Sequence, residues 1–132
     1  MSDWHLRLAR PKDAGDMVAL AGRDLPALPL RGGHTLVAHA AGALAGMLLA
    51  SVRRRVLMVE QVYVRPENRR QGIGGGLVRA CLIDAGNTGF HQVAAAGCPS
   101  EPESLRFYAR FGFAPDEDGD GLVLVLGRRV ED

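Results

Sequence analysis

The hydrophobic positions in the first half of the chain fall into short runs with turn residues between them. Residues 4–9 alternate as a strand does, and residues 14–23 are expected to form a helix with Asp13 as its N-cap. Prolines and paired glycines make residues 25–33 a loop. Three apolar runs then predict a meander of antiparallel strands at residues 35–40, 43–52 and 56–64.

Helix and strand patterns alternate in the second half. A glycine-rich turn precedes a helical segment at residues 77–85, and a short apolar strand follows at residues 92–96. A strand, a helix and a strand in this order favour a right-handed parallel crossover. Residues 103–111 are expected to form a helix that Gly112 ends, and residues 122–126 a last strand. The order β-α-β-β-β-α-β-α-β predicts a mixed α/β chain of the α+β class.

Length and composition are those of one globular domain. We expect residues 1–132 to form a single domain, and the 47% hydrophobic and 23% charged residues exclude wholesale disorder. No apolar run could span a bilayer and the N-terminus lacks a secretory signal pattern, so a cytoplasmic protein without a membrane partner is expected. Cys81 and Cys98 lack metal-ligand spacing and are expected to be free thiols, and no metal site is expected.

The net charge of +1 neither favours nor excludes a nucleic-acid partner. The basic clusters are Arg53-Arg54-Arg55 and Arg69-Arg70, and aromatic residues that would stack on bases are not interleaved with them. No nucleic-acid partner is therefore expected. We interpret the three consecutive arginines as a solvated turn between strands, and a contact with an acidic partner or with the nucleotide end of a cofactor is the alternative.

The stretch from Arg69 to Gly76 is the most informative part of the chain for function. Four glycines in five positions open a helix, although each costs about 1 kcal/mol relative to alanine inside a helix. Unpaired N–H groups and the positive end of the dipole make a helix start a site for anions. A P-loop would need a lysine after the glycines, and the only lysine is Lys12. A dinucleotide fingerprint would need glycine in place of Leu77, so both of these phosphate motifs are excluded.

The remaining pattern, Arg-x-x-Gly-x-Gly, resembles the acyl-CoA pyrophosphate loop of the GNAT superfamily of N-acyltransferases. Residues 62–74 are similar to the strand and loop of that family, and residues 104–113 to its tyrosine helix with a terminal Gly-Phe. The resemblance implies the GNAT fold, a mostly antiparallel twisted sheet of about six to seven strands with a splayed parallel pair, flanked by three to four helices. It also implies acetyl-CoA as co-substrate, and a homodimer would be in keeping with a family in which dimers are common.

By this resemblance, main-chain donors of the glycine turn bind the pyrophosphate and a strand edge binds the pantetheine arm. Arg69 assists the phosphates, and the N–H of Val62 polarises the thioester carbonyl and holds the oxyanion that forms on attack. The structural alternative is that the glycines only allow close packing of helix on sheet. The implied cofactor-binding residues are Val62, Tyr63, Val64, Arg69, Arg70, Gln71, Gly72, Ile73, Gly74 and Gly75.

Two side chains are candidates for the chemistry. Glu60 is the one charged residue of an apolar strand, so it is expected to face a cleft and to act as general base for an amine. Its position matches the glutamate of polyamine acetyltransferases, and the alternative is a solvated glutamate that orients substrate. Tyr108 resembles the family's tyrosine near the CoA sulfur, with packing as its alternative role. Ser100-Glu101-Pro102 replaces the asparagine that is common at the start of that helix.

The sequence thus predicts an N-acetyltransferase that moves an acetyl group from acetyl-CoA to a primary amine of a small molecule or peptide, by direct attack in a ternary complex. Residues 26–30 are expected to line the acceptor entrance. Cys98 lacks a paired histidine for an acyl-enzyme, and His34, His39 and His91 are interpreted as structural or surface residues. The alternatives are a catalytically silent acyl-CoA sensor and an interaction domain without a cofactor.

Overall fold

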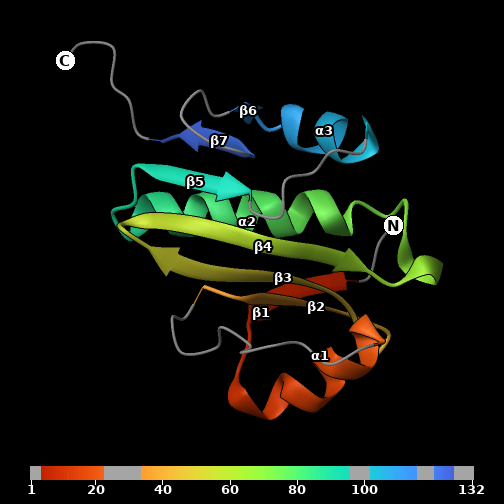
Figure 1. Cartoon of the computed structure of the whole chain (residues 1–132). Coiled ribbons are helices and arrows are strands. Elements are labelled where there is room, and N and C mark those ends of the chain that lie inside the picture. The colour runs from red at the N-terminus through yellow and green to blue at the C-terminus, as the bar shows by residue number, and fades with distance from the viewer. Residues whose placement is uncertain (1–3, 23–33, 96–101, 116–120, 127–132) are drawn as a thin grey trace.

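A computed structural model describes residues 4–22, 34–95, 102–115 and 121–126. These residues form a seven-stranded mixed sheet in the order β1-β2-β3-β4-β5-β7-β6 (Figure 1). The strands are β1 Trp4–Leu8, β2 Leu36–Ala40, β3 Ala43–Arg53, β4 Val56–Val64, β5 Gln92–Ala95, β6 Ala114–Pro115 and β7 Leu122–Val125. The helices are α1 Ala14–Ala21, α2 Ile73–Asn87 and α3 Pro102–Ala109, with short 3-10 helices η1 Pro11–Asp13 and η2 Pro66–Asn68.

The first four strands pair antiparallel, and β2, β3 and β4 are the predicted meander. Both two-residue turns have positive φ at each central residue, 52° at Ala41 and 78° at Gly42, then 53° at Arg54 and 66° at Arg55. Turns of this kind match the twist of the paired strands. The predicted hairpins are therefore confirmed, and β3 continues one residue further than expected, to Arg53.

Parallel pairing begins between β4 and β5, as the predicted crossover requires. β5 lies parallel to β4, and α2 connects the two strands. β7 pairs antiparallel with β5, and the short strand β6, which the sequence did not predict, pairs with β7. Pro115 of β6 has no N–H to donate to a ladder, which suits the edge of the sheet.

Two apolar clusters fix α1 and α2 on opposite faces of the sheet. Met17 and Leu20 of α1 pack with Met47 of β3 in one cluster. The next residue of β3, Leu48, belongs to the other cluster together with Leu77 of α2. Because successive side chains of a strand point to opposite faces, α1 covers one side of the sheet and α2 the other.

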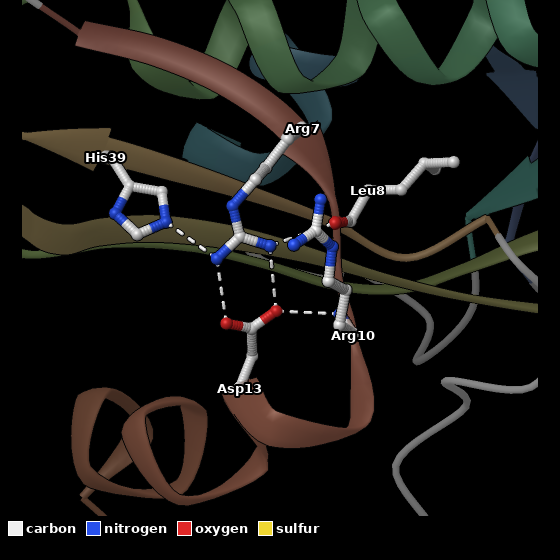
Figure 2. Close-up of polar contacts among 5 residues, drawn as sticks. All are labelled: Arg7, Leu8, Arg10, Asp13 and His39. Atoms are coloured by element: carbon white, nitrogen blue, oxygen red, sulfur yellow. Dashed lines mark hydrogen bonds and ion pairs between the residues drawn. The ribbon is translucent and has the colours of Figure 1, made fainter.

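The connection from β1 to α1 is held by one carboxylate. The terminal nitrogens of Arg7 donate to Asp13 at 2.8 and 2.9 Å, and the amide of Arg10 donates to it at 2.7 Å. Figure 2 shows the Arg7 guanidinium between Asp13 and His39, whose Nε2 lies 2.9 Å from Arg7 Nη2. Asp13 precedes α1 as predicted, but its side chain makes no cap hydrogen bond to that helix. The prediction of Asp13 as the N-cap residue is confirmed by its position, and its carboxylate bonds to the nearby guanidinium because that is the stronger partner.

Three helix ends show what the glycines do. α1 ends at Ala21, earlier than predicted, because Gly22 takes a left-handed φ of 72°. α2 begins at Ile73, earlier than predicted, since the glycines that follow are part of its first turn. α3 ends at Ala109, two residues earlier than predicted, and Gly112 closes the turn that follows the helix, with φ of 97° and its N–H bonded to the Ala109 carbonyl at 3.0 Å.

Candidate active site

The candidate site lies where β4 continues beyond its parallel partner. Within the described ranges, β5 pairs with β4 only from Leu57 to Val59, and the last residues of β4, from Val62 to Val64, border a pocket of about 770 Å³. The predicted cofactor residues meet there except Gln71, whose carbonyl accepts the indole N–H of Trp4 at 3.0 Å. The lining residues are Val62, Tyr63, Val64, Asn68, Arg69, Arg70, Gly72, Ile73, Gly74, Gly75, Phe107, Tyr108 and Arg110.

The main chain of β4 turns hydrogen-bonding groups towards this pocket. The N–H of Arg65 donates to the Ala45 carbonyl of β3 at 2.8 Å. In an antiparallel ladder alternate residues address the same neighbour, so the main-chain groups of Val62 and Val64 point away from β3, towards the pocket. On that side the Val64 carbonyl accepts a hydrogen bond from Arg69 Nε at 3.2 Å.

The turn before α2 presents a row of amides to the pocket. Arg70 and Gly72 have left-handed φ values of 66° and 84°. The N–H of Gly76 donates to the Gly72 carbonyl at 2.9 Å as the first bond of the helix. The amides of Ile73, Gly74 and Gly75 therefore have no acceptor within the helix. Together with the positive end of the helix dipole, these amides fit an anion of the size of a diphosphate.

The glycines of this turn are required for different structural reasons. A Cβ at Gly76 would lie 2.6 Å from the Trp4 ring, so Gly76 allows β1 to pack on α2. Cβ atoms at Gly74 and Gly75 would meet phenyl rings only at 3.6 Å, an ordinary contact distance. Both of these glycines line the pocket. The packing alternative thus explains Gly76, whereas Gly74 and Gly75 keep the wall of the pocket free of side chains.

Tyr108 borders the pocket from the side of α3. Its side chain is 9% exposed and makes edge-to-face contacts with Phe107 and Phe113, with ring centroids 5.2 and 5.3 Å apart. Burial raises the pKa of the Tyr108 hydroxyl, so the group is protonated at neutral pH. Tyr108 therefore packs in the core and also lines the pocket, and its part in the chemistry stays a prediction.

Glu60 does not line the pocket. It is the extra residue of a β-bulge, because Leu49 pairs with Gln61 and the next pair of the ladder skips Glu60. Its side chain is exposed and accepts a hydrogen bond from Ser51 Oγ at 2.5 Å. Ala50 faces the α2 cluster, so Ser51 and the Glu60 carboxylate lie on the opposite face of the sheet. The sequence predicted that Glu60 faces a cleft. In the structure its side chain is exposed to solvent on the α1 face of β4, the same strand whose last residues line the pocket.

The three histidines that the sequence analysis considered are in structural contacts or at the surface. His34 Nδ1 lies 2.7 Å from Asp84 Oδ2 of α2, which ties the start of β2 to the helix. His39 contacts Arg7, and His91 is exposed. The interpretation of these histidines as structural or surface residues agrees with these contacts.

Cys81 is a buried free thiol, as predicted, and burial and the Asp84 carboxylate raise its pKa to about 12. Cys98 and residues 26–30, the predicted acceptor entrance, lie outside the described residues. In the part of the chain that the structure describes, no group of three His, Cys, Asp or Glu side chains is placed to hold a metal ion. The described helices also include none with the length and apolar character needed to cross a bilayer.

Three lining residues had no role in the sequence interpretation. They are Asn68, Phe107 and Arg110. Phe107 lies in the last turn of α3 and Arg110 directly follows the end of the helix, so this spacing of three residues brings both to one side of it. That spacing beside Tyr108 could have identified them, whereas Asn68 depends on the course of η2 and carries no such signal.

Comparisons with known proteins agree with this geometry. The model of the Acetyltransferase (GNAT) family matches residues 6–113, and no curated protein matches the chain. Among solved structures, Arabidopsis thaliana Naa50 in complex with the bisubstrate analogue CoA-Ac-MVNAL is 17% identical, with 95% of this chain and 99% of that chain covered and a TM-score of 0.79. The ribosomal-protein-S18-alanine N-acetyltransferase from Escherichia coli is 16% identical, with 98% and 97% covered and a TM-score of 0.76. A GNAT family acetyltransferase from Brucella melitensis in complex with acetyl-CoA is 22% identical, with 97% and 91% covered and a TM-score of 0.70.

These similarities confirm the fold that the sequence predicted. The seven-stranded sheet with one parallel pair and its three α-helices is the α+β arrangement of the GNAT fold. The family match spans most of the chain, and the predicted enzyme class, an acetyl-CoA-dependent N-acetyltransferase, is the class of that family. The chain belongs to the acetyltransferase (GNAT) family.

Proposed function

We propose that this chain transfers an acetyl group from acetyl-CoA to a primary amine of a small molecule or peptide, by direct attack in a ternary complex. The observation that carries the proposal is the pocket in which the helix-start amides, the β4 edge and Tyr108 meet. In this proposal residues 1–132 act as one catalytic domain.

The pocket suits the extended and anionic form of an acyl-CoA. The amides of Ile73, Gly74 and Gly75 hold the diphosphate, with Arg70 beside them. The outward-facing main chain of Val62 and Val64 holds the pantetheine arm. Two proteins of the same fold support this assignment, because the Brucella acetyltransferase was solved with acetyl-CoA and Naa50 with a CoA bisubstrate analogue.

The thioester end of this ligand lies between β4 and α3. The N–H of Val62 donates to the thioester oxygen and stabilises its negative charge as the amine attacks, an effect of about 3 kcal/mol in other acyl transfers. The C–N bond forms and the C–S bond breaks. Tyr108 donates its proton to the departing sulfur, and the excess proton on the attacking nitrogen passes through water to restore the Tyr108 hydroxyl.

The attacking amine must first lose a proton, and Glu60 is the general base in this proposal. Its carboxylate is exposed on the α1 face of β4, so it removes the proton through water. The hydrogen bond from Ser51 Oγ at 2.5 Å fixes the orientation of that carboxylate. Ser51 is therefore a positioning residue and Glu60 the residue that accepts the proton.

Release of CoA thiol across a panel of amines tests the activity, and Glu60→Gln tests the base. We expect Glu60→Gln to lower kcat about a hundredfold while the Kd for CoA stays within about twofold, because the side chain lies outside the pocket lining. Asp16→Asn is the matched control, since it removes an exposed carboxylate of α1 and should leave kcat unchanged.

The outcomes separate the alternatives. Equal turnover of Glu60→Gln and the unmodified chain excludes Glu60 as the base. Thermal stabilisation by acetyl-CoA without thiol release for any amine identifies a silent acyl-CoA sensor. Absence of stabilisation by CoA or acetyl-CoA at millimolar concentration overturns the proposed function.

A further inference from the structure

We propose that Arg110 binds the 3′-phosphate of the CoA ribose, in a subsite separate from the diphosphate site at the start of α2. The inference rests on the proposed function, because it takes acetyl-CoA as the ligand of the pocket. It assigns a second anion-binding element, located just beyond the end of α3.

The Phe107 ring lies beside both Arg110 and Gly74 and so brings Arg110 close to the start of α2. Arg110 lines the same pocket as the glycine turn. Its guanidinium lies over the Phe107 ring, 5.7 Å from the centroid, and a Cβ at Gly74 would lie 3.6 Å from the same ring. The cation–π contact restricts the long side chain to one side of Phe107. The guanidinium is therefore held close to the phosphate-binding amides but comes from a different element.

Arg110 is available to a ligand in a way that Arg7, Arg65 and Arg69 are not. Arg7 is bonded to Asp13, Arg65 to the Leu44 carbonyl and Arg69 to the Val64 carbonyl. Within the described ranges, no carboxylate lies within ion-pair distance of Arg110, and its side chain is exposed. A ligand phosphate would not have to displace an existing partner.

The chemistry of CoA supplies a second anion for this group. The diphosphate takes the amides of α2, whereas the 3′-phosphate is a monoester with close to two negative charges, because its second pKa is about 6. A guanidinium offers a planar fork of N–H donors that matches the oxygens of a phosphate monoester. The charged fork of Arg110, just beyond the end of α3, is therefore expected to bind the 3′-phosphate, which the backbone amides of α2 leave unpaired.

Calorimetric titration with CoA and with dephospho-CoA, which lacks only the 3′-phosphate, tests the inference. We expect the unmodified chain to bind CoA about tenfold more tightly than dephospho-CoA, as for a charge-assisted contact that water partly screens. Arg110→Ala should weaken CoA binding about tenfold and change dephospho-CoA binding by less than about twofold. Arg110→Lys keeps the charge without the fork and should be intermediate.

Arg106→Ala is the matched control, because it removes the same charge from an exposed position of α3 that does not line the main pocket. It should leave both dissociation constants unchanged. Arg110→Gln keeps an unbranched polar side chain without the charge and replaces the alanine variant if that variant fails to fold. The inference is overturned if Arg110→Ala weakens the binding of CoA and of dephospho-CoA equally, or weakens neither. It is also overturned if the unmodified chain binds CoA and dephospho-CoA equally well. Each of these results leaves the proposed function standing. Binding of neither ligand by the unmodified chain overturns both.

Discussion

Asp13 accepts hydrogen bonds from a side chain of β1 and from the main chain before η1. The residue is 5% exposed, so its charge is tolerated because Arg7 and the Arg10 amide replace lost water. The hydrogen bonds from Arg7 hold the pKa of Asp13 far below its usual range against the opposing effect of burial. Burial and the charge of Arg7 lower the pKa of His39, which is therefore neutral and can accept from Arg7.

We predict that Asp13→Asn lowers the free energy of unfolding by about 2 kcal/mol at neutral pH, because Arg7 loses its charged partner. The folded pKa of Asp13 lies below the unfolded value of about 4, so its contribution is complete above that pH and is lost as the pH falls through the folded pKa. Urea unfolding of both proteins from neutral pH to about pH 3 should show the difference shrinking in acid. A difference that does not change with pH would contradict the role of the charge, and Asp16→Asn should show no difference at either pH.

The β3–β4 hairpin is the element in which sequence and backbone agree least. Its two central residues, Arg54 and Arg55, both have positive φ, where asparagine and glycine are preferred. A side chain with a Cβ is strained there. Both arginines are exposed, as the interpretation of a solvated turn predicted.

We predict that the double substitution Arg54→Asn with Arg55→Gly raises the free energy of unfolding by about 1 kcal/mol, because it relieves the strain at both positive-φ residues. Thermal unfolding measures the gain. Arg54→Gln with Arg55→Gln is the control, since it removes the same two charges and keeps the backbone strain. An equal gain in both double variants would assign the effect to charge repulsion.

The start of α2 is a second element in which packing determines the sequence. Trp4 reaches from β1 to this turn, donates its indole N–H to Gln71 and occupies the space beside Gly76. A glycine inside a helix costs about 1 kcal/mol, and here that cost allows β1 to lie against α2. Trp4 is also the only tryptophan of the chain, so its fluorescence reports on this contact.

We predict that Gly76→Ala lowers the melting temperature although alanine is the better helix former, because its Cβ would lie 2.6 Å from the Trp4 ring and would displace it. The tryptophan emission should shift to longer wavelength as the ring moves into water. Gly86→Ala is the matched control, since a Cβ there meets nothing within 4 Å. That variant should gain up to about 1 kcal/mol with unchanged emission, and a stabilised Gly76→Ala would contradict the contact.

Features of the fold that depend on local pattern were predictable, and features that depend on distant contacts were not. The meander, the crossover and the glycine turn each follow from a pattern of consecutive residues, and the structure confirms them. The exposure of Glu60 follows from a β-bulge, whose register requires two strands to be aligned. The ring beside Gly76 is that of Trp4, which comes from β1 across the fold, and Arg110 lines the pocket only because α3 lies beside α2.

At the scale of the whole molecule, the sheet consists of two unequal parts. β1 to β4 form one antiparallel part, and β5, β7 and β6 form the other. In the described residues, the ladder between the parts comprises the pairs Leu57 with Val93, Met58 with Ala94 and Val59 with Ala95. Parallel pairs are slightly less stable per residue than antiparallel ones. The ladder that joins the two parts in the middle of the sheet is therefore short and parallel, although α2 packs across the first part.

The short ladder has a consequence for the life of the protein in a cell. In the proposed function, a molecule of acetyl-CoA lies between β4 and α3 and so touches both parts of the sheet. Binding to the intact form alone reduces the population of opened molecules by mass action. Opened molecules are the ones that proteases degrade. Scarcity of acetyl-CoA would then shorten the lifetime of the enzyme as well as slow its reaction.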